Sequence, residues 1–529
     1  MAQSFPVPSD HVARRATLGD QLRRNALRIG DQEAIVAVGH GSRRALTFAD
    51  LDLAATRLGS ALRAHGVGRG DVVALIGRST PELLVGFWGA VKAGAAATGV
   101  NPAFTPRELH HQLAHSRAKV IVATAEAAAL IDDLEAPLPD LRLRVTESGD
   151  APAGWQALAS LVAGADDAAP AADIHEDDPA LIPYTSGTTA LPKAVMLSHR
   201  TYVAATIPAY AAGLGFREGD RFYYVMPLHT MAGLGSQVSL LSVGATVVLP
   251  SEVTPDAALR VLVDERITIM GQTPTFYLQL LRAAGFDAAD LSALERCVTY
   301  GGTMPRAMFE GFAAAAPGLV WLTLWSQSEI GQTPTVGRFR SLDDIPGGDP
   351  AWIGRPTPQL EVRVVDADGA DADEGELLCR TPGVMLGYLD DPDRTAEVLK
   401  DGWLHTGDLV RRDAAGDLFF VDRRHDVIKS GGMNVSSVEV ERVLYGHGGV
   451  LEAAVVGLPD DYWGQAVTAY VVARDGAQLD AGEVIAHART QLAAFKLPKT
   501  VRIVDALPKD AQGKILKREI RAREQAGTG

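Results

Sequence analysis

Cysteine is scarce in this sequence, and positive charge is not in excess. The 529 residues include two cysteines, Cys297 and Cys379, which are too few for a disulfide framework or a cysteine-rich zinc cluster in a chain of this length. The formal net charge is −15 at pH 7, and an acidic surface repels the phosphates of nucleic acids. We therefore expect reduced, buried thiols and no nucleic-acid partner.

Long apolar runs are also lacking. Residues 1–18 carry charges and contain no apolar stretch of the kind that a signal peptide needs. The apolar segment 83–100 is interrupted by Lys92 and by several glycines, so it falls short of the roughly 20 apolar residues of a membrane span. We expect no membrane association and a cytoplasmic location.

The composition that remains is that of a globular protein. Hydrophobic residues make up 47% of the chain and charged residues 22%, which is average for a folded protein, and the length suggests roughly three or four lobes. Apolar runs at 72–76 and 119–123 alternate with a helical pattern at 51–65, which predicts parallel strands joined by crossover helices. A second α/β region is expected over residues 181–324, with elements at 245–249, 255–265 and 267–270.

The pattern becomes β-rich at 360–378 and 418–422. A small unit follows, with elements expected at 438–445, 453–457, 466–473 and 484–492. The sequence therefore predicts an α/β fold in which a large N-terminal domain (residues 1–422) contains α/β subdomains plus a β-rich subdomain, and a small mobile C-terminal α+β domain spans residues 426–529. Residues 147–178 are rich in Ala, Asp, Gly and Pro, which favours a surface loop or linker.

One polar segment carries the first chemical signal. Residues 184–193 read Tyr-Thr-Ser-Gly-Thr-Thr-Ala-Leu-Pro-Lys, between the apolar pair 181–182 and a helical run from Ser198, so we expect strand, loop and helix in that order. Hydroxyl groups, backbone amides near Gly187 and the Lys193 ammonium suit nucleotide phosphates, although the spacing is not that of a P-loop. Taken alone, so short a polar run is better explained by a surface turn rich in Ser and Thr.

This segment resembles the phosphate loop of the adenylate-forming superfamily, which includes acyl-CoA synthetases, aryl-CoA ligases, firefly luciferases and the adenylation domains of peptide synthetases. Six further motifs match in the family's order, so the resemblance covers nearly the whole chain. They lie at residues 301–303, 325–329, 353–356, 402–409, 422–423 and 513–514.

The resemblance implies roles for individual residues. Asp408 would accept hydrogen bonds from both ribose hydroxyls, Glu329 would hold Mg²⁺ against the ATP phosphates, and Arg423 would contact ribose or phosphate. Trp325 and Ser326 stand where most relatives have Tyr-Gly, and we expect Trp325 to stack on adenine. The nucleotide-binding residues implied in this way are Thr185, Ser186, Gly187, Thr188, Thr189, Lys193, Gly301, Gly302, Thr303, Trp325, Ser326, Gln327, Ser328, Asp408 and Arg423.

Two half-reactions would use different faces of the C-terminal domain. Lys514 resembles the family lysine that serves adenylation, where a cation at about 4 Å from the reacting anions offsets about 4 kcal/mol at an effective dielectric of 20. A rotation about residues 422–426 would then bring a second face forward. That pivot holds His425, where most relatives have Asp or Lys. The second face offers Lys429 as a further catalytic candidate, and the coenzyme A tunnel is assigned to Ser430, Gly431 and Gly432.

The acid site is less regular. Residues 227–233 resemble the acyl-site motif, but the usual histidine position falls on Thr230, with His229 one place earlier. The residues assigned to the acid pocket are His229, Thr230, Ala232, Gly233, Thr275, Phe276, Gly301 and Gln332. They include no cation, so we expect a mostly apolar carboxylic acid.

Three functions stay open from the sequence. The leading hypothesis is an acyl-CoA synthetase that uses ATP, Mg²⁺ and coenzyme A, as a homodimer. Ala190 replaces a glycine, at a cost of about 1 kcal/mol if that position needs a positive φ, so the alternative is a ligase that takes a preformed acyl-adenylate from another enzyme. A non-catalytic nucleotide-binding protein is the third hypothesis. A peptide-synthetase domain is disfavoured, because the acyl motif lacks an aspartate for an amino group.

Overall fold

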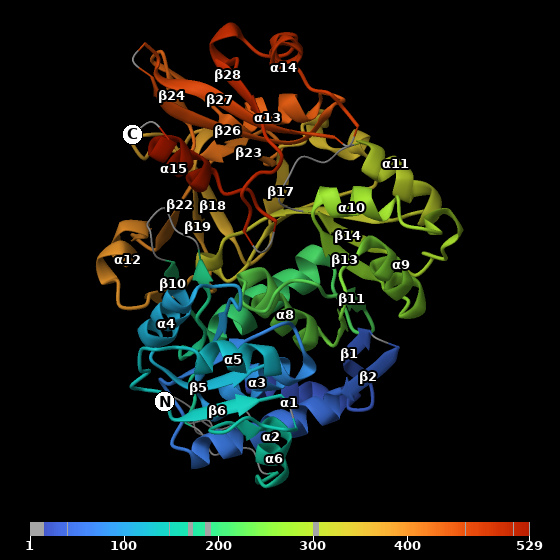
Figure 1. Ribbon diagram of the computed structural model, residues 1–529, viewed down its shortest axis with the longest axis vertical. Helices are drawn as coiled ribbons and strands as arrows, with labels where there is room; N and C mark the ends of the chain where they lie inside the picture. Colours follow the sequence, from blue (N-terminus) through green and yellow to red (C-terminus); the bar gives the residue numbers. More distant parts are fainter. Residues whose placement is uncertain are drawn as a thin grey trace, which may run out of the picture.

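The computed structural model describes residues 15–39, 41–147, 149–167, 173–185, 192–299, 306–460, 462–474, 476–510 and 513–527. Three β-sheets with flanking helices make up this part of the chain (Figure 1). The α/β class predicted from the sequence is confirmed.

The sheet nearest the N-terminus contains nine strands in the described residues. In spatial order they are β20 (Gly387–Tyr388), β10 (Lys193–Ser198), β8 (Pro179–Leu181), β4 (Ala96–Val100), β3 (Val72–Ile76), β5 (Ala118–Ala123), β6 (Leu143–Thr146) and β7 (Gln156–Ala157), with β9 (Tyr184–Thr185) beside β10. Helices α2 (Phe48–Ala64), α3 (Pro81–Ala93), α4 (Pro106–His115), α5 (Ala125–Asp132) and α6 (Leu158–Ala163) accompany it.

The centre of this sheet follows directly from the sequence. All five residues of β3 are apolar and buried, and β3 pairs in parallel with both β4 and β5. The Thr80 side chain accepts a hydrogen bond from the Leu83 amide and so caps α3, and Pro81 occupies its first turn. The predicted strands at 72–76 and 119–123 and the predicted crossover helices are therefore confirmed.

The largest sheet contains fourteen described strands. In spatial order they are β18 (Glu361–Val365), β19 (Glu374–Arg380), β22 (Trp403–Arg412), β23 (Leu418–Arg423), β17 (Trp352–Pro356), β16 (Thr335–Phe339), β15 (Val320–Trp325), β14 (Arg296–Thr299), β13 (Ile269–Gln272), β11 (Arg221–Tyr223), β12 (Thr246–Pro250), β1 (Glu33–Gly39) and β2 (Ser42–Thr47), with β21 (Leu399–Lys400) beside β22. Its helices are α1 (Leu18–Ile29), α7 (Ile207–Ala209), α8 (Ser236–Val243), α9 (Pro255–Asp264), α10 (Pro274–Leu280), α11 (Arg306–Ala315) and α12 (Pro392–Val398), together with the wide turns η1 (Thr201–Thr206), η2 (Tyr210–Leu214) and η3 (Met231–Gly235).

The two halves of this sheet differ in strand direction. From β12 to β15 neighbouring strands run parallel, whereas from β15 to β18 they run antiparallel. The antiparallel half is the β-rich region that the sequence predicted. Because the carboxyl ends of parallel strands meet at one edge of a sheet, the segments that follow β13, β14 and β15 lie near one another.

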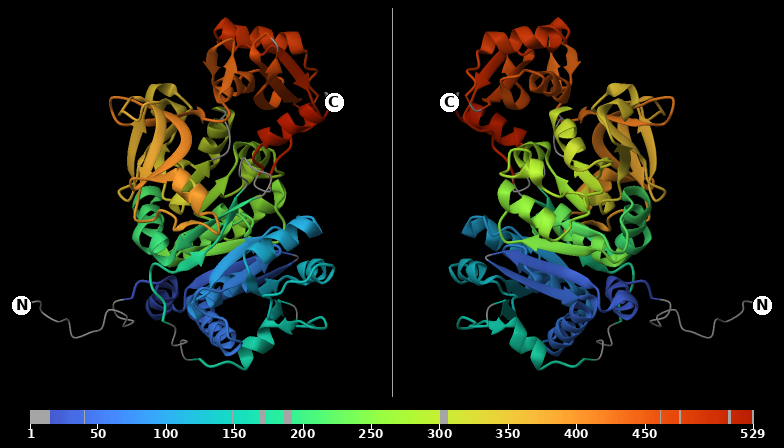
Figure 2. Two further views of the ribbon diagram at one scale, coloured as in Figure 1. Left: turned by 90° about the vertical axis from the view of Figure 1, so that its left-hand side faces the viewer. Right: turned by 90° about the vertical axis from the view of Figure 1, so that its right-hand side faces the viewer.

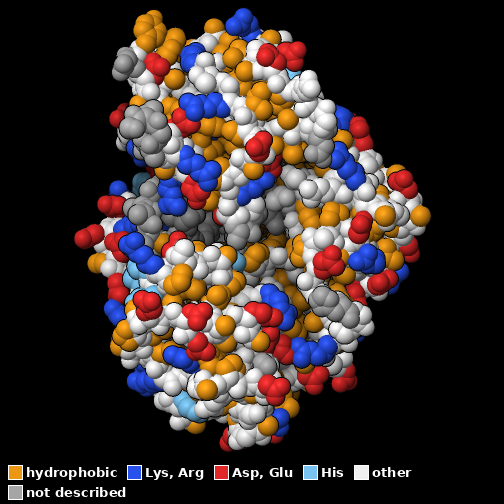
Figure 3. Space-filling view, viewed as in Figure 1, with side chains coloured by type: hydrophobic (Ala, Val, Ile, Leu, Met, Phe, Trp, Pro, Cys, Tyr) orange, Lys and Arg blue, Asp and Glu red, His pale blue; other side chains and the backbone are white. Residues whose placement is uncertain are grey.

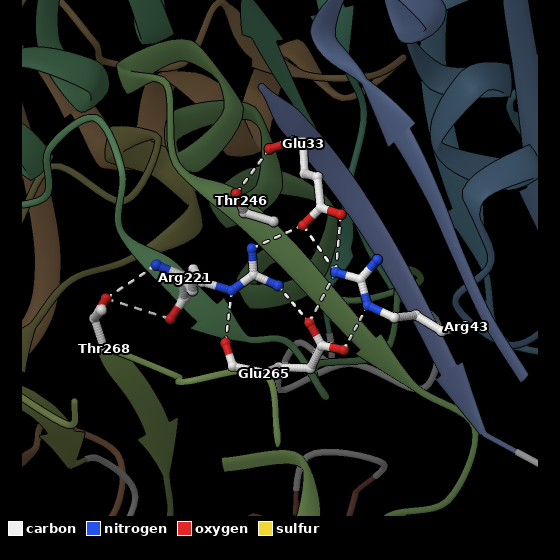
Figure 4. A network of polar contacts seen from close by, with 6 residues as sticks. All are labelled: Glu33, Arg43, Arg221, Thr246, Glu265 and Thr268. Atoms are coloured by element: carbon white, nitrogen blue, oxygen red, sulfur yellow. Dashed lines mark hydrogen bonds and ion pairs between the residues drawn. The ribbon is translucent and has the colours of Figure 1, made fainter. Parts of the chain in front are cut away.

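A charged network fastens the β1–β2 hairpin to the large sheet (Figure 4). Arg43 on β2 donates to Glu265 after α9 (Nε to Oε1, 2.8 Å), and Arg221 on β11 donates to Glu33 on β1 (Nη1 to Oε2, 2.9 Å). Ion pairs between Arg43 and Glu33 and between Arg221 and Glu265 close the ring. Burial alone would raise the pKa of Glu33, but the two arginines lower it below its ordinary value. Four charges of alternating sign thus join segments about 200 residues apart in the chain.

The third sheet belongs to the small C-terminal unit. Its five described strands are β25 (Met433–Val435), β24 (Ile428–Ser430), β27 (Gly464–Ala473) and β26 (Val450–Asp460), with β28 (Thr500–Ile503) beside β27. Helices α13 (Ser437–Tyr445), α14 (Ala481–Arg489) and α15 (Lys517–Gly527) pack around it. Figures 1 and 2 show this unit (orange to red) at one end of the molecule. The four elements predicted here are confirmed. The large sheet ends with β23 at Arg423, and the small sheet begins with β24 at Ile428.

Contacts across this junction tie the two parts together. Asp349 accepts from Arg411 on β22 (3.2 Å) and from Arg442 on α13 (3.4 Å). Asp422 accepts from the Ser437 amide (2.6 Å) and hydroxyl (2.9 Å). The domain limits at 422 and 426 stay a prediction.

Two local predictions were wrong. Residues 147–178 contain β7 and α6 and are not wholly a loop. Lys193 begins strand β10, whereas the sequence suggested a loop that runs directly into a helix. Strand β10 forms because its apolar residues pair with β8 and β20 on either side, and such tertiary pairing overrides a short helical pattern. No helix in the described ranges has the length and apolarity needed to cross a membrane.

Candidate active site

Three charged or polar groups meet at the end of β10. Lys193 Nζ donates to Glu329 Oε1 at 2.5 Å and to the Tyr388 hydroxyl at 2.9 Å. The Tyr388 hydroxyl donates to the same Glu329 oxygen at 2.8 Å. Lys193 begins β10 and Tyr388 ends β20, its neighbour, while Glu329 lies on η5 (Ser328–Ile330), the turn that follows β15. The structure therefore joins two residues that the sequence motifs singled out, Lys193 and Glu329, and adds Tyr388, which the motifs missed.

Glu329 is held in its ionised form. Burial alone would raise the pKa of its carboxyl, but the Lys193 ammonium and the Tyr388 hydroxyl lower it below the ordinary value. Both side-chain contacts use Oε1, and Oε2 takes part in neither. In proteins Mg²⁺ is usually bound by one or two carboxylates together with substrate phosphates. A single ionised carboxylate beside the Lys193 ammonium fits that donor set, so Glu329 is the residue that would hold the ion. The described residues contain no cluster of three or more acidic, histidine or cysteine side chains that would hold a metal by themselves.

Asp408 forms a second polar centre. It lies on β22, and 3% of its surface is exposed. Trp325 Nε1 and Gln327 Nε2 each donate to its Oδ2 at 2.8 Å. Arg423, opposite Asp408 in the β22–β23 pairing, places Nε 3.5 Å from Oδ1. Four of the predicted nucleotide-binding residues therefore lie together.

The charges of this second centre act on Lys514, a residue of the small unit. Its surface is exposed, yet partial removal of water and, after it, the positive charge of Arg423 together lower its pKa to about 8. Asp408 and Asp426 act in the opposite direction. A lysine that experiences the charges of Arg423 and Asp408 belongs to the same site. In the space-filling view, the surface turned toward the viewer is hollowed below the small unit (Figure 3).

The residues predicted for the hinge and for the coenzyme A tunnel lie at the junction and in the small unit. His425 is exposed, and burial of part of its ring lowers its pKa, while its neighbour Asp426 accepts from Arg521 on α15 at 2.7 Å. Lys429 is exposed on β24. Ser430 is buried, and Gly431 and Gly432 form the turn to β25 with φ of 58° and 79°, a backbone shape that suits glycine.

Four of the acid-site candidates lie in the first turns of two helical segments. Thr275 and Phe276 lie in α10, while Ala232 and Gly233 lie in η3. Thr230 does not point a free hydroxyl into a pocket, because it caps η3. Its Oγ1 accepts from the Gly233 amide (2.9 Å) and donates to the Pro227 carbonyl (2.8 Å).

Two other candidates carry buried polar atoms without a partner. Both ring nitrogens of His229 and the Oε1 of Gln332 have no hydrogen-bond partner among the described residues. Burial lowers the pKa of His229 to about 4, so its ring is neutral. Gln332 has φ of 65°, an uncommon value for a residue other than glycine. A Cβ atom at Gly235 would come within 2.5 Å of Gln332 Oε1 and 3.1 Å of the Tyr202 hydroxyl, so the ends of these side chains lie close to the Gly235 backbone.

Several predicted residues lie outside the described part of the chain. Of the phosphate loop, the structure places Thr185, which ends β9, and Lys193. Ser326 follows β15, and Ser328, on the other side of Gln327, begins η5. The residues outside are Ser186, Gly187, Thr188, Thr189, Ala190, Gly301, Gly302 and Thr303.

Comparison with known proteins agrees with this geometry. The family model described as AMP-binding enzyme matches residues 22–389, and the model of the AMP-binding enzyme C-terminal domain matches residues 439–514. A feruloyl-CoA synthase of Amycolatopsis sp is 35% identical over 92% of this chain and 95% of its own length. A 3-[(3aS,4S,7aS)-7a-methyl-1,5-dioxo-octahydro-1H-inden-4-yl]propanoyl:CoA ligase of Mycobacterium tuberculosis is 36% identical over 96% and 98%.

A solved structure of similar shape is the anthranilate CoA ligase AuaEII in complex with anthranoyl-AMP. It has a TM-score of 0.85 and 27% identity, over 97% of this chain and 98% of that one. The family models cover both the large part and the small unit, in the order that the motifs indicated. The chain therefore belongs to the AMP-binding enzyme family, within the adenylate-forming superfamily.

Proposed function

We propose that this enzyme is an acyl-CoA synthetase, an AMP-forming acid–thiol ligase that works through an acyl-adenylate. The observation that carries the proposal is that Lys514 of the small unit lies within electrostatic reach of Asp408 and Arg423, which contact each other. A cation from the small unit is thus close enough to act on the residues proposed to bind the nucleotide. That arrangement suits a reaction in which a carboxylate attacks an α-phosphate.

Adenylation would be the first step. A carboxylate oxygen of the acid attacks the α-phosphorus of ATP, the bond to the β-phosphate breaks, and pyrophosphate leaves. Lys193 holds the leaving phosphates, and Asp408 with Arg423 fixes the ribose. Lys514 offsets the charge of the two anions as they meet. Mg²⁺ bound at Glu329 would neutralise charge on the phosphates.

Thioester formation would be the second step. The thiol sulfur of coenzyme A attacks the acyl carbonyl, the bond to the AMP oxygen breaks, and AMP leaves while the thiol proton passes to solvent. We propose that the unit of residues 426–529 turns about His425 relative to residues 1–422 for this step. It would then present Lys429 and the Ser430–Gly432 turn. His425→Pro should slow thioester formation from supplied acyl-adenylate more than it slows adenylation.

The acid is proposed to be mostly apolar. Phe276, Ala232 and Gly233 supply apolar surface or space, and the described acid-site candidates include no cation. The relatives are named for feruloyl-CoA and for a ring-bearing propanoyl-CoA, which supports an acid that carries a ring. Release of pyrophosphate with a panel of aryl, alkyl and fused-ring acids would identify the class. A panel in which only charged acids react would overturn this part of the proposal.

A second candidate keeps the thioester step alone. Ala190, in place of the glycine of most relatives, favours this candidate. The deciding experiment is acid-dependent exchange of labelled pyrophosphate into ATP by the pure protein. Exchange is expected if the enzyme makes its own adenylate. Thioester formation from supplied acyl-adenylate, without any exchange, would establish the second candidate.

A homodimer is also proposed, and sedimentation of the pure protein tests it.

A further inference from the structure

The indole of Trp325 is turned into the protein. Trp325 ends β15, and 8% of its surface is exposed. Its ring packs in a buried cluster with Ile330, Ile353 and Leu404. Its one polar atom, Nε1, donates to Asp408 Oδ2 at 2.8 Å. The side chain therefore joins the core of the antiparallel half of the sheet to the carboxylate assigned to ribose.

Gln327 completes the hold on that oxygen. Its Nε2 donates to Asp408 Oδ2 at 2.8 Å and to the Thr406 carbonyl at 3.0 Å. A carboxylate oxygen offers about two lone-pair positions, so two donors fill Oδ2. Oδ1 stays on the side of Arg423, 3.5 Å from its Nε. The rotation of the carboxylate is thereby fixed, because turning it would break both bonds to Oδ2.

We propose that Trp325 is a positioning residue for nucleotide selection. Its N–H, with that of Gln327, locks Asp408 so that Oδ1 is presented to a ribose hydroxyl. Trp325 thereby sets how strongly the enzyme prefers ATP to its deoxy analogues. The inference rests on the proposed role of Asp408. It also differs from the stacking on adenine that the sequence suggested, since it depends on the N–H and not on the face of the ring.

The chain supplies a matched pair for comparison. Trp352 Nε1 donates to Asp417 Oδ1 at 2.9 Å, and both side chains are buried. Asp417 is also bound by Arg355 at 2.8 Å. Asp417 precedes β23, whereas Arg423 ends it, so this pair lies at the opposite end of the strand from the nucleotide centre. Trp325→Phe and Trp352→Phe each remove one buried N–H bond to a carboxylate and keep an aromatic ring.

The test compares nucleotides in the Trp325→Phe enzyme. Values of kcat/KM are measured for ATP, 2′-deoxy-ATP and 3′-deoxy-ATP at saturating acid and coenzyme A. We expect the preference for ATP over at least one deoxy analogue to shrink about tenfold, as for loss of a hydrogen bond to a charged group. The loss should fall mainly on the KM for ATP. Gln327→Met should reduce the same preference. Trp352→Phe should leave the preference as in the wild type, even where it lowers the thermal midpoint equally.

The outcomes separate this inference from the proposed function. An unchanged preference in both Trp325→Phe and Gln327→Met would overturn the inference. An equal loss for ATP and both deoxy analogues would overturn it as well, in favour of adenine stacking. Asp408→Asn tests the foundation. If this variant keeps the wild-type preference, Asp408 does not read the ribose and the proposed nucleotide site fails. If Asp408→Asn abolishes the preference and Trp325→Phe does not alter it, only the inference fails.

Discussion

The nucleotide side and the acid side of the candidate site differ in how their polar atoms are bonded. On the nucleotide side, Glu329 and Asp408 each accept two hydrogen bonds from neighbouring side chains. On the acid side, both nitrogens of His229 and the Oε1 of Gln332 are buried without a partner in the described residues. Apart from the Thr185 hydroxyl, which is buried without a partner, the described nucleotide side is thus a prebonded half, whereas the acid side combines a bonded Thr230 with two unsatisfied side chains.

The difference reflects what each half has to recognise. A nucleotide site gains from charges that are fixed before the ligand arrives, since no reorganisation is then needed during reaction. An unpaired buried oxygen or nitrogen costs about 1–3 kcal/mol, and such a cost is tolerated where a ligand makes the missing bond. We infer that the acid site was shaped at the expense of stability and the nucleotide site was not.

The largest expected effect comes from Lys514, the lysine proposed to serve adenylation. Lys514→Ala should reduce acid-dependent exchange of pyrophosphate into ATP by roughly a thousandfold, because about 4 kcal/mol of charge stabilisation is lost. Thioester formation from supplied acyl-adenylate should change by less than about threefold. Arg523→Ala, which replaces an exposed basic residue of α15, is the matched control. Equal losses in both half-reactions would contradict the role of Lys514 in adenylation.

The prebonded half can be weakened at Tyr388. Tyr388→Phe removes the hydroxyl that bonds both Lys193 and Glu329, so the KM for MgATP should rise about tenfold while the KM for the acid stays the same. Steady-state kinetics measures both values. Tyr445→Phe removes a hydroxyl contact within the small unit and serves as the control. If the two variants behave alike, the Tyr388 contact has no bearing on ATP.

The pH dependence should differ between the half-reactions. The active form of Lys514 is the ammonium, and its lowered pKa of about 8 means that the charge is lost as the pH rises through 8. Pyrophosphate exchange should therefore fall about twofold by pH 8 and about tenfold by pH 9. Lys514→Arg should move this decline to higher pH, because a guanidinium stays protonated. An identical decline in the arginine variant would assign the titration to another group.

The smallest expected effect is a gain in stability on the acid side. Gln332→Met keeps the length of the side chain and removes the unpaired oxygen, so the free energy of unfolding should rise by about 1 kcal/mol. The thermal midpoint should rise by roughly 1–2 °C, while kcat/KM for the acid falls. Gln279→Met, on the exposed face of α10, should change neither value. A lower midpoint in Gln332→Met would show that its oxygen is satisfied in solution.

Much of the fold followed from periodicity in the sequence. Strand β3 and helix α9 could be predicted because apolar runs and helical spacing are local properties. Strand β10 could not, since it depends on pairing with β20, almost 200 residues later. The individual members of the site were predicted by resemblance, but their bonds were not.

Those bonds depend on tertiary contacts. The Lys193–Tyr388 bond joins residues 195 positions apart, and the Trp325–Asp408 bond joins residues 83 apart. No sequence pattern indicates that the indole N–H of a tryptophan donates a hydrogen bond to a distant carboxylate. The unpaired state of His229 was equally hidden, because its position in the motif shows the residue type and not its surroundings.

The ring of Glu33, Arg43, Arg221 and Glu265 has an evolutionary consequence. Each charge is balanced by two neighbours, so replacing one leaves its partners uncompensated, whereas replacing all four with apolar residues of similar volume is often tolerated in proteins. The effects of substitutions that share one network are not additive. The four positions are therefore expected to drift together, and ancestors with one or two of the charges would be less stable than those with all or none.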